Sequence, residues 1–174
     1  MKINLKKLIF LAFIFATLSS FSQECEVKND PITGEKTCIF SNKAGTLKYE
    51  YKVGGVINFF TTFNYSGEQN FAMPKGSEII IKLENDSIIR LYSIVEAMPQ
   101  TRVVANQYGA SVYTYYTFAF ELTAEQVKTL ASSDVVFMRY PAISGGSNDY
   151  EVKGFGKIFA KKITKGAQCI LENL

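Results

Sequence analysis

TLKYEYKVGGVINFFTTFNY, residues 46–65, is the stretch that decides the fold. Large apolar side chains occupy alternate positions on both sides of the pair Gly54-Gly55, and polar residues fill most positions between them. Alternation with a period of two is typical of a β-strand with one buried and one solvated face. The stretch therefore predicts two strands joined by a glycine turn, with a buried face formed by Leu47, Tyr49, Tyr51, Val53, Ile57, Phe59, Phe63 and Tyr65.

The same alternation recurs further along the chain. It predicts strands at residues 79–83, 88–95, 116–122 and 134–140. The third of these has one apolar side, formed by Tyr116, Phe118, Phe120 and Leu122. Residues 97–111 follow no period, and we expect them to form an irregular segment.

Two helices complete the pattern. The sequence Thr123-Ala124-Glu125-Gln126 matches a capping box and predicts a short helix that ends near Leu130. Residues 157–172 place apolar side chains on one stripe and lysines on the other, which predicts a C-terminal helix. Strands and helices do not alternate, so a parallel nucleotide-binding sheet is not expected. We predict a mainly β fold: an antiparallel β-sandwich or partly open barrel with one short helix and a C-terminal helix.

The first residues have the three-part pattern of an export signal. Three lysines precede an apolar run at residues 8–18, and small serines follow it. The run has about eleven apolar positions, whereas a spanning helix needs roughly 20. We predict a cleavable signal peptide at residues 1–22, with an uncleaved anchor as the alternative. A single mostly-β domain at residues 23–174 then remains, periplasmic or secreted, with no membrane span after cleavage.

The charge balance bears on the partner. The chain carries 19 basic and 16 acidic residues, and three of the basic residues lie in the predicted signal. The exported part is therefore formally neutral, with 16 residues of each sign. Binding to a phosphate backbone requires a basic surface, so we predict no nucleic-acid partner.

The absence of histidine narrows the chemistry. Without it the chain has no Ser-His-Asp or Cys-His nucleophile system and no histidine-ligated metal. Its three cysteines are too few for a four-thiolate site, so neither a metal nor another cofactor is predicted. A hydrolase with paired carboxylates remains as an alternative. Its candidate acids are Glu50, Glu84, Asp86, Glu96 and Glu121.

Cysteines of exported proteins usually form disulfides. Cys25 and Cys38 flank Asp30-Pro31-Ile32-Thr33-Gly34, which has the residues of a hairpin turn. Two registers are open, with Asp30 opposite Glu35 or opposite Thr33, and both place the two cysteines on one face within bridging range. We favour a Cys25–Cys38 disulfide with Cys169 free. Pairings that use Cys169 remain as alternatives.

Aromatic residues indicate a binding surface. Tyr113 and Tyr115 have the opposite phase to Phe118 and Phe120, so they should point away from the core. Together with Tyr108 they adjoin the segment that carries Arg102, and tyrosine beside arginine is typical of recognition surfaces. The alternative is that a loop or the last helix covers this face and makes it a second core.

Short glycosylation motifs are also present. Asp86-Ser87-Ile88 is similar to an acceptor of periplasmic O-glycosylation, with Ser87 as the acceptor residue. Asn64-Tyr65-Ser66 and Asn85-Asp86-Ser87 match the N-glycosylation triplet. Such short motifs also occur by chance.

Several short features recur in a recognisable order. They are Cys25, the Asp30-Pro31-x-Thr33-Gly34 hairpin, the Leu122-Thr123-x-Glu125-Gln126 helix start and a strand around Arg139. In this order they resemble a group of small, uncharacterised exported proteins of Gram-negative bacteria with an Asp-x-x-Thr-Gly hairpin. The strand Val136-Phe137-Met138-Arg139-Tyr140 departs from the Lys-Ile-Arg-Ile type of that group. The resemblance implies export and a strand-rich domain, and it assigns no functional residue.

The sequence thus favours an exported, non-enzymatic binding or accessory protein. Its binding surface is expected around Arg102, Tyr108, Tyr113 and Tyr115, for a protein or glycan partner. The alternatives are a carboxylate-dependent hydrolase and a structural component of the cell envelope.

Overall fold

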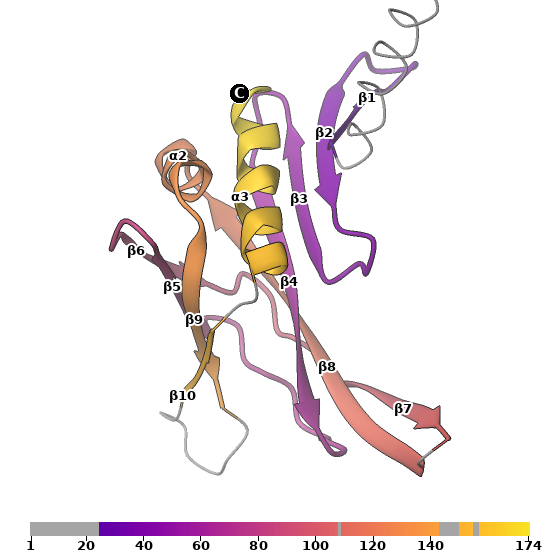
Figure 1. Ribbon diagram of the computed structural model, residues 1–174. Helices are drawn as coiled ribbons and strands as arrows, with labels where there is room; N and C mark the ends of the chain where they lie inside the picture. Colours follow the sequence, from indigo (N-terminus) through magenta and orange to yellow (C-terminus); the bar gives the residue numbers. More distant parts are fainter. Residues whose placement is uncertain (1–24, 108, 143–149, 155–156) are drawn as a thin grey trace, which may run out of the picture.

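The computed structural model describes residues 25–107, 109–142, 150–154 and 157–174. Within them the chain forms two antiparallel sheets and two helices (Figure 1). The larger sheet has six strands in the order β1-β2-β3-β4-β8-β7, and the smaller has four in the order β10-β9-β5-β6. The elements are β1 (Cys25–Asn29), β2 (Lys36–Ser41), β3 (Leu47–Lys52), β4 (Ile57–Ser66), β5 (Glu78–Leu83), β6 (Ile88–Tyr92), β7 (Gln100–Asn106), β8 (Gly109–Leu122), α2 (Ala124–Ser132), β9 (Val135–Pro141), β10 (Tyr150–Gly154) and α3 (Lys157–Leu171). The expected mainly β class with a short and a C-terminal helix is confirmed.

The larger sheet is covered on one face by two different layers. Helix α3 packs against β2 and β3 at one end of that face and also contacts α2 and β9. The smaller sheet covers the other end of that face. There Tyr140 of β9 stacks on Phe63 of β4, with ring centroids 4.3 Å apart. Figure 1 shows α3 and the smaller sheet on the same side of the long strands β4 and β8. The core lies between these layers.

A row of aromatic rings crosses four strands of the larger sheet on this inward face. Phe40, Tyr49, Phe59 and Phe120 are direct register partners on β2, β3, β4 and β8. Successive ring centroids lie 6.3, 4.7 and 6.0 Å apart, and each side chain is at most 2% exposed. The alternation that begins at Leu47 therefore defines the buried face as predicted. Val53 is the exception, since it lies beyond the end of β3 and is 53% exposed.

The first hairpin forms at the expected turn. The Asp30 carboxylate accepts hydrogen bonds from the backbone N–H groups of Ile32 and Thr33, at 2.7 and 3.1 Å, and these bonds lower the pKa of Asp30. Gly34 has φ +72°, which an L side chain rarely adopts. The Asp30 N–H donates to the Glu35 carbonyl, which selects the register with Asp30 opposite Glu35.

The disulfide differs from the one that the sequence favoured. Cys25 bonds to Cys169 of α3, and Cys38 is a free, buried thiol. Cys25 lies opposite Phe40, so Cys38 is its diagonal neighbour on the same face, as that register requires. Helix α3 packs on this face and brings Cys169 to both cysteines. The pairing Cys25–Cys38 is therefore wrong in this structure, and a pairing through Cys169 takes its place.

Both predicted helices are present. Thr123 accepts a hydrogen bond from the Gln126 N–H, and the Gln126 side chain accepts one from the Thr123 N–H, which confirms the capping box. On α3 the lysines Lys157, Lys161 and Lys165 are exposed, as expected for its solvated face. Neither of the two described helices has the length and apolar composition needed to cross a bilayer.

The prediction of an irregular segment at residues 97–111 is wrong, because most of this segment lies in β-strands. Residues 100–106 form β7, which pairs with the first half of β8 from Gln100↔Tyr115 to Asn106↔Gly109. This stretch follows no simple alternation because both of its faces are largely solvated, and a polarity pattern then carries little information.

Gly166 is the residue that allows α3 to approach the sheet. A Cβ at this position would lie 2.5 Å from the Tyr49 ring and 2.8 Å from the Phe40 ring. In an exposed helix, replacing glycine by alanine stabilises by up to about 1 kcal/mol. We expect Gly166→Ala instead to lower the free energy of unfolding by about 1–3 kcal/mol, because the added methyl group would overpack the contact with the two rings.

Urea denaturation checks this expectation, with Lys165→Ala as the control at the adjacent exposed position. The control should change stability by less than about 0.5 kcal/mol. A Gly166→Ala protein as stable as the wild type would contradict the close packing of α3 on Tyr49 and Phe40.

Thr61 is the one polar interruption of the inward row on β4. It is 1% exposed, and its hydroxyl has no hydrogen-bond partner among the described residues. A buried hydroxyl without a partner loses about 1–3 kcal/mol of solvation. We expect Thr61→Val, of nearly the same shape, to raise the melting temperature. Thr62→Val is the control, because the Thr62 hydroxyl bonds that of Thr117 on the outward face at 2.9 Å and should bring no gain.

Candidate functional site

The outward face of β8 carries the tyrosines that the sequence selected. Tyr113 and Tyr115 are half-buried, whereas Phe118 and Phe120 of the same strand are fully buried on the inward face. Helix α3 packs on the inward face, where the Tyr49 hydroxyl donates to the Ile163 carbonyl at 3.2 Å. The last helix therefore does not cover the two tyrosines.

Arg102 joins these tyrosines across the β7–β8 pair. It lies directly opposite Tyr113, and its guanidinium is 5.4 Å from the centroid of the Tyr115 ring. A cation over an aromatic face at this distance is attracted by the ring quadrupole. Arg102 is exposed, so the contact lies at the surface of the sheet. Three residues that the sequence predicted to share a site, Arg102, Tyr113 and Tyr115, are thus brought together; Tyr108 lies outside the described residues.

The strands that carry this cluster extend beyond the rest of the sheet. β4 pairs with β8 only over Tyr113–Leu122, and the Gly67 N–H, just beyond β4, donates to the Val112 carbonyl at 2.9 Å. Within the described strands, residues 109–111 of β8 therefore pair with β7 alone. Figure 1 shows the resulting two-stranded ribbon projecting from the body of the protein. Val103 and Val104 lie in this projecting part and are 66% and 46% exposed. We call residues 100–106 of β7 together with residues 109–115 of β8 the ribbon.

Sequence reasoning missed another aromatic residue on the outward face of the larger sheet. Phe60 of β4 breaks the alternation of its strand and is half-buried on the outward side. The Lys48 ammonium lies 5.5 Å from the centroid of its ring. The sequence could have indicated Phe60, because an aromatic residue at a position where the alternation of a strand calls for a polar one is expected to be partly covered or functional. The outward face thus carries two cation–aromatic pairs.

The acids proposed for a hydrolase are spread over several elements of the fold. Glu50 and Glu121 share the outward face, but Asn58 stands between them in the register of β3, β4 and β8. Lys48 forms an ion pair with Glu50, and Glu121 is exposed. Glu84 lies in the turn after β5 of the smaller sheet, and Asp86 of the same turn pairs with Lys82.

Ser87 lies at the tip of the β5–β6 hairpin. Its N–H donates to the Asn85 side chain at 3.1 Å, and Asp86 adopts φ +63° in the turn. The serine is half-buried, while Asn85 and Asp86 are exposed. Its role as a glycosylation acceptor stays a prediction.

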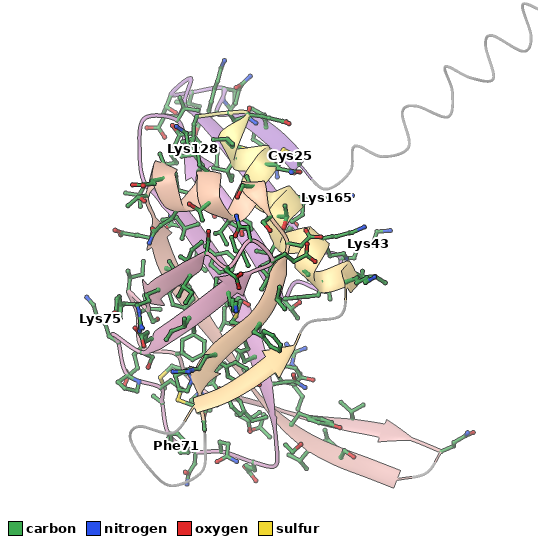
Figure 2. The ribbon with its side chains drawn as sticks, turned by 60° about the vertical axis from the view of Figure 1, so that its left-hand side comes forward. Cys25, Lys43, Phe71, Lys75, Lys128 and Lys165 are labelled. Carbon is green, nitrogen blue, oxygen red and sulfur yellow. A yellow bond between two sulfur atoms is a disulfide. The ribbon has the colours of Figure 1, made fainter. Side chains whose placement is uncertain are left out.

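The three cysteines form a second cluster, on the inward face at the opposite edge of the larger sheet. Their sulfur atoms all lie within 4.8 Å of one another, and Cys38 Sγ is 3.5 Å from Cys169 Sγ. Burial raises the pKa of the Cys38 thiol, and the negative charge of Glu172 raises it further. In Figure 2 Cys25 lies at the start of β1, next to α3.

Comparison of the chain with family models, with curated proteins and with solved structures finds no match. The resemblance to small exported proteins with an Asp-x-x-Thr-Gly hairpin stays a prediction. The function is therefore argued from the residues of this chain.

Adjacent tyrosines on β8 provide a test of which face is core. Tyr116 is 0% exposed, and its hydroxyl donates to the Phe71 carbonyl at 2.7 Å. We expect Tyr116→Ser to lower the free energy of unfolding by about 3–5 kcal/mol, as for other large core truncations. Tyr115→Ser should lower it by about 1 kcal/mol, because it removes one cation–π contact and the cross-strand pairs with Asn64 and Gln100. Thermal unfolding followed by circular dichroism checks both values, and similar losses for the two variants would contradict a solvated outward face.

Proposed function

We propose that this chain is an exported, non-enzymatic binding module that holds an extended segment of a protein partner along the ribbon. The observation that supports it is the cluster of Arg102, Tyr113 and Tyr115 at the base of a two-stranded projection. Tyrosine and arginine are enriched where interfaces gain most of their binding energy.

A protein partner is favoured over a glycan by the free edge of β7. This strand is the last of the larger sheet, so one side of its backbone has no neighbouring strand in the described part of the chain. An extended peptide that adds to such an edge gains main-chain hydrogen bonds, and adjacent side-chain sites give selectivity. The strand contains no proline or lysine, its one charged residue is Arg102, and it exposes Val103 and Val104.

Export is part of the proposal. The predicted signal at residues 1–22 and the disulfide between Cys25 and Cys169 support an oxidising compartment, either the periplasm or the outside of the cell. The partner is then a protein of the same compartment.

Site-specific photo-crosslinking in cells tests the proposal. A photoreactive residue at Val104 should give a discrete adduct with one protein of the envelope or medium. The matched control places the photoreactive residue at Ile88, which is 61% exposed on the edge strand β6, and this variant should not give that adduct.

The substitutions Tyr113→Ser and Tyr115→Ser in the same chain should reduce the Val104 adduct at least tenfold while the protein stays folded. Tyr92→Ser on β6, which replaces an exposed tyrosine outside the ribbon, should leave the yield unchanged. No adduct at Val104, identical adducts at Val104 and Ile88, or a yield that is insensitive to Tyr113 and Tyr115 would each contradict the proposal.

A further inference from the structure

The three cysteines lie close enough for one disulfide to be exchanged for another. Cys38 Sγ lies 3.5 Å from the sulfur of Cys169, which is bonded to Cys25. This distance is near van der Waals contact between sulfur atoms, so no residue or water separates the free thiol from the disulfide. Disulfides isomerise when a thiolate attacks one of their sulfur atoms.

We propose that this cluster is a disulfide-exchange centre that releases Cys25 as a reactive thiol. The Cys38 thiolate attacks Cys169 Sγ, the bond between Cys169 and Cys25 breaks, and a Cys38–Cys169 disulfide forms. Cys25 leaves as a thiolate and takes up the proton that Cys38 lost. One disulfide and one thiol are present before and after, so this step needs no oxidant or reductant.

The fold supports this direction of exchange. Cys38 and Cys169 are 0% and 5% exposed, whereas Cys25 is half-buried on β1, an edge strand whose other four residues are exposed. After exchange α3 stays bonded to the sheet, now through β2, which is an interior strand. Among the described strands β1 pairs with β2 alone, so the released thiol lies on an edge strand that no disulfide then holds.

The resting arrangement restrains the reaction. In the exchange reaction the attacking, central and leaving sulfur atoms lie in a line. Cys38 Sγ is 3.5 Å from Cys169 Sγ, and a disulfide bond is about 2 Å long, so a linear arrangement would place Cys38 Sγ about 5.5 Å from Cys25 Sγ. In the structure all three lie within 4.8 Å of one another and form a triangle. A side-chain rotation at Cys25 or Cys38 must therefore precede attack. The raised pKa of Cys38 also keeps its thiol protonated near neutral pH.

Release gives Cys25 a chemistry that the bonded form lacks. The Cys25 thiolate attacks the disulfide of a second molecule, one sulfur of which bonds to Cys25 while the other leaves as a thiolate. The co-reactant is a small-molecule or protein disulfide, which an oxidising compartment supplies. The centre thus makes residue 25 a site of covalent attachment, independently of whether the ribbon binds a partner.

Trapping the released thiol tests the exchange. The exported wild-type protein is incubated folded with N-ethylmaleimide and mapped by mass spectrometry without reduction. We expect the label on Cys25 in molecules that contain a Cys38–Cys169 disulfide. In Cys38→Ser the attacking sulfur is absent, so labelling of Cys25 should fall at least tenfold while Cys25–Cys169 stays intact.

Three outcomes would overturn the proposal: label on Cys38 with Cys25–Cys169 retained, no label on any cysteine of the folded protein, or equal labelling of Cys25 in wild type and Cys38→Ser. Cys25→Ser provides a second test, which does not depend on the rate of disulfide exchange. Treated with oxidised glutathione while folded, it should form Cys38–Cys169. If it keeps both thiols, or only carries glutathione on them, the two sulfur atoms cannot bond and the proposal fails.

Discussion

The contact between Gly166 and the aromatic row determines how the rest of the molecule is arranged. Phe40, Tyr49, Phe59 and Phe120 turn one face of four neighbouring strands into a continuous aromatic surface. Gly166 lets α3 approach that surface more closely than any residue with a side chain would allow. Tyr49 and Phe40 lie directly under Gly166, and all four rings are at most 2% exposed. Burial of apolar surface is the dominant favourable term in folding. Cys169, one turn after Gly166, is held over β1 and β2 by the same contact.

Much of this arrangement was predictable because it depends on local periodicity. The strands around Tyr49 and Phe120, the capping box at Thr123 and the hairpin turn at Asp30 each have a signal within a few residues. β7 had no such signal. Its two faces are both largely solvated, so residues such as Val103 and Val104 show no alternation with polar neighbours, and only pairing with β8 defines the strand. The outward placement of Tyr113 and Tyr115 could still be predicted, because it follows from the phase of β8.

The disulfide shows a different limit. Cys25 and Cys38 are neighbours through the local hairpin, and the sequence correctly places them on one face. Cys169 is 144 residues from Cys25 and reaches it only because α3 packs on that face. A long-range contact of this kind depends on tertiary packing, for which the sequence between the two cysteines carries no direct signal. The prediction failed in the choice of partner and not in the geometry of the hairpin.

The two functional proposals concern opposite edges of one sheet. β1, with Cys25, is the first strand of the six and β7, with Arg102, is the last, so five strand spacings of about 4.8 Å separate them along the sheet. The strands between them are β2, β3, β4 and β8. The rings of the aromatic row pack against one another across the inward faces of these four strands. Detachment of β1 after exchange leaves that row in place, because Phe40 of β2 is its first member. The covalent site and the ribbon are therefore expected to act without coupling, and each can be altered while the other is kept intact.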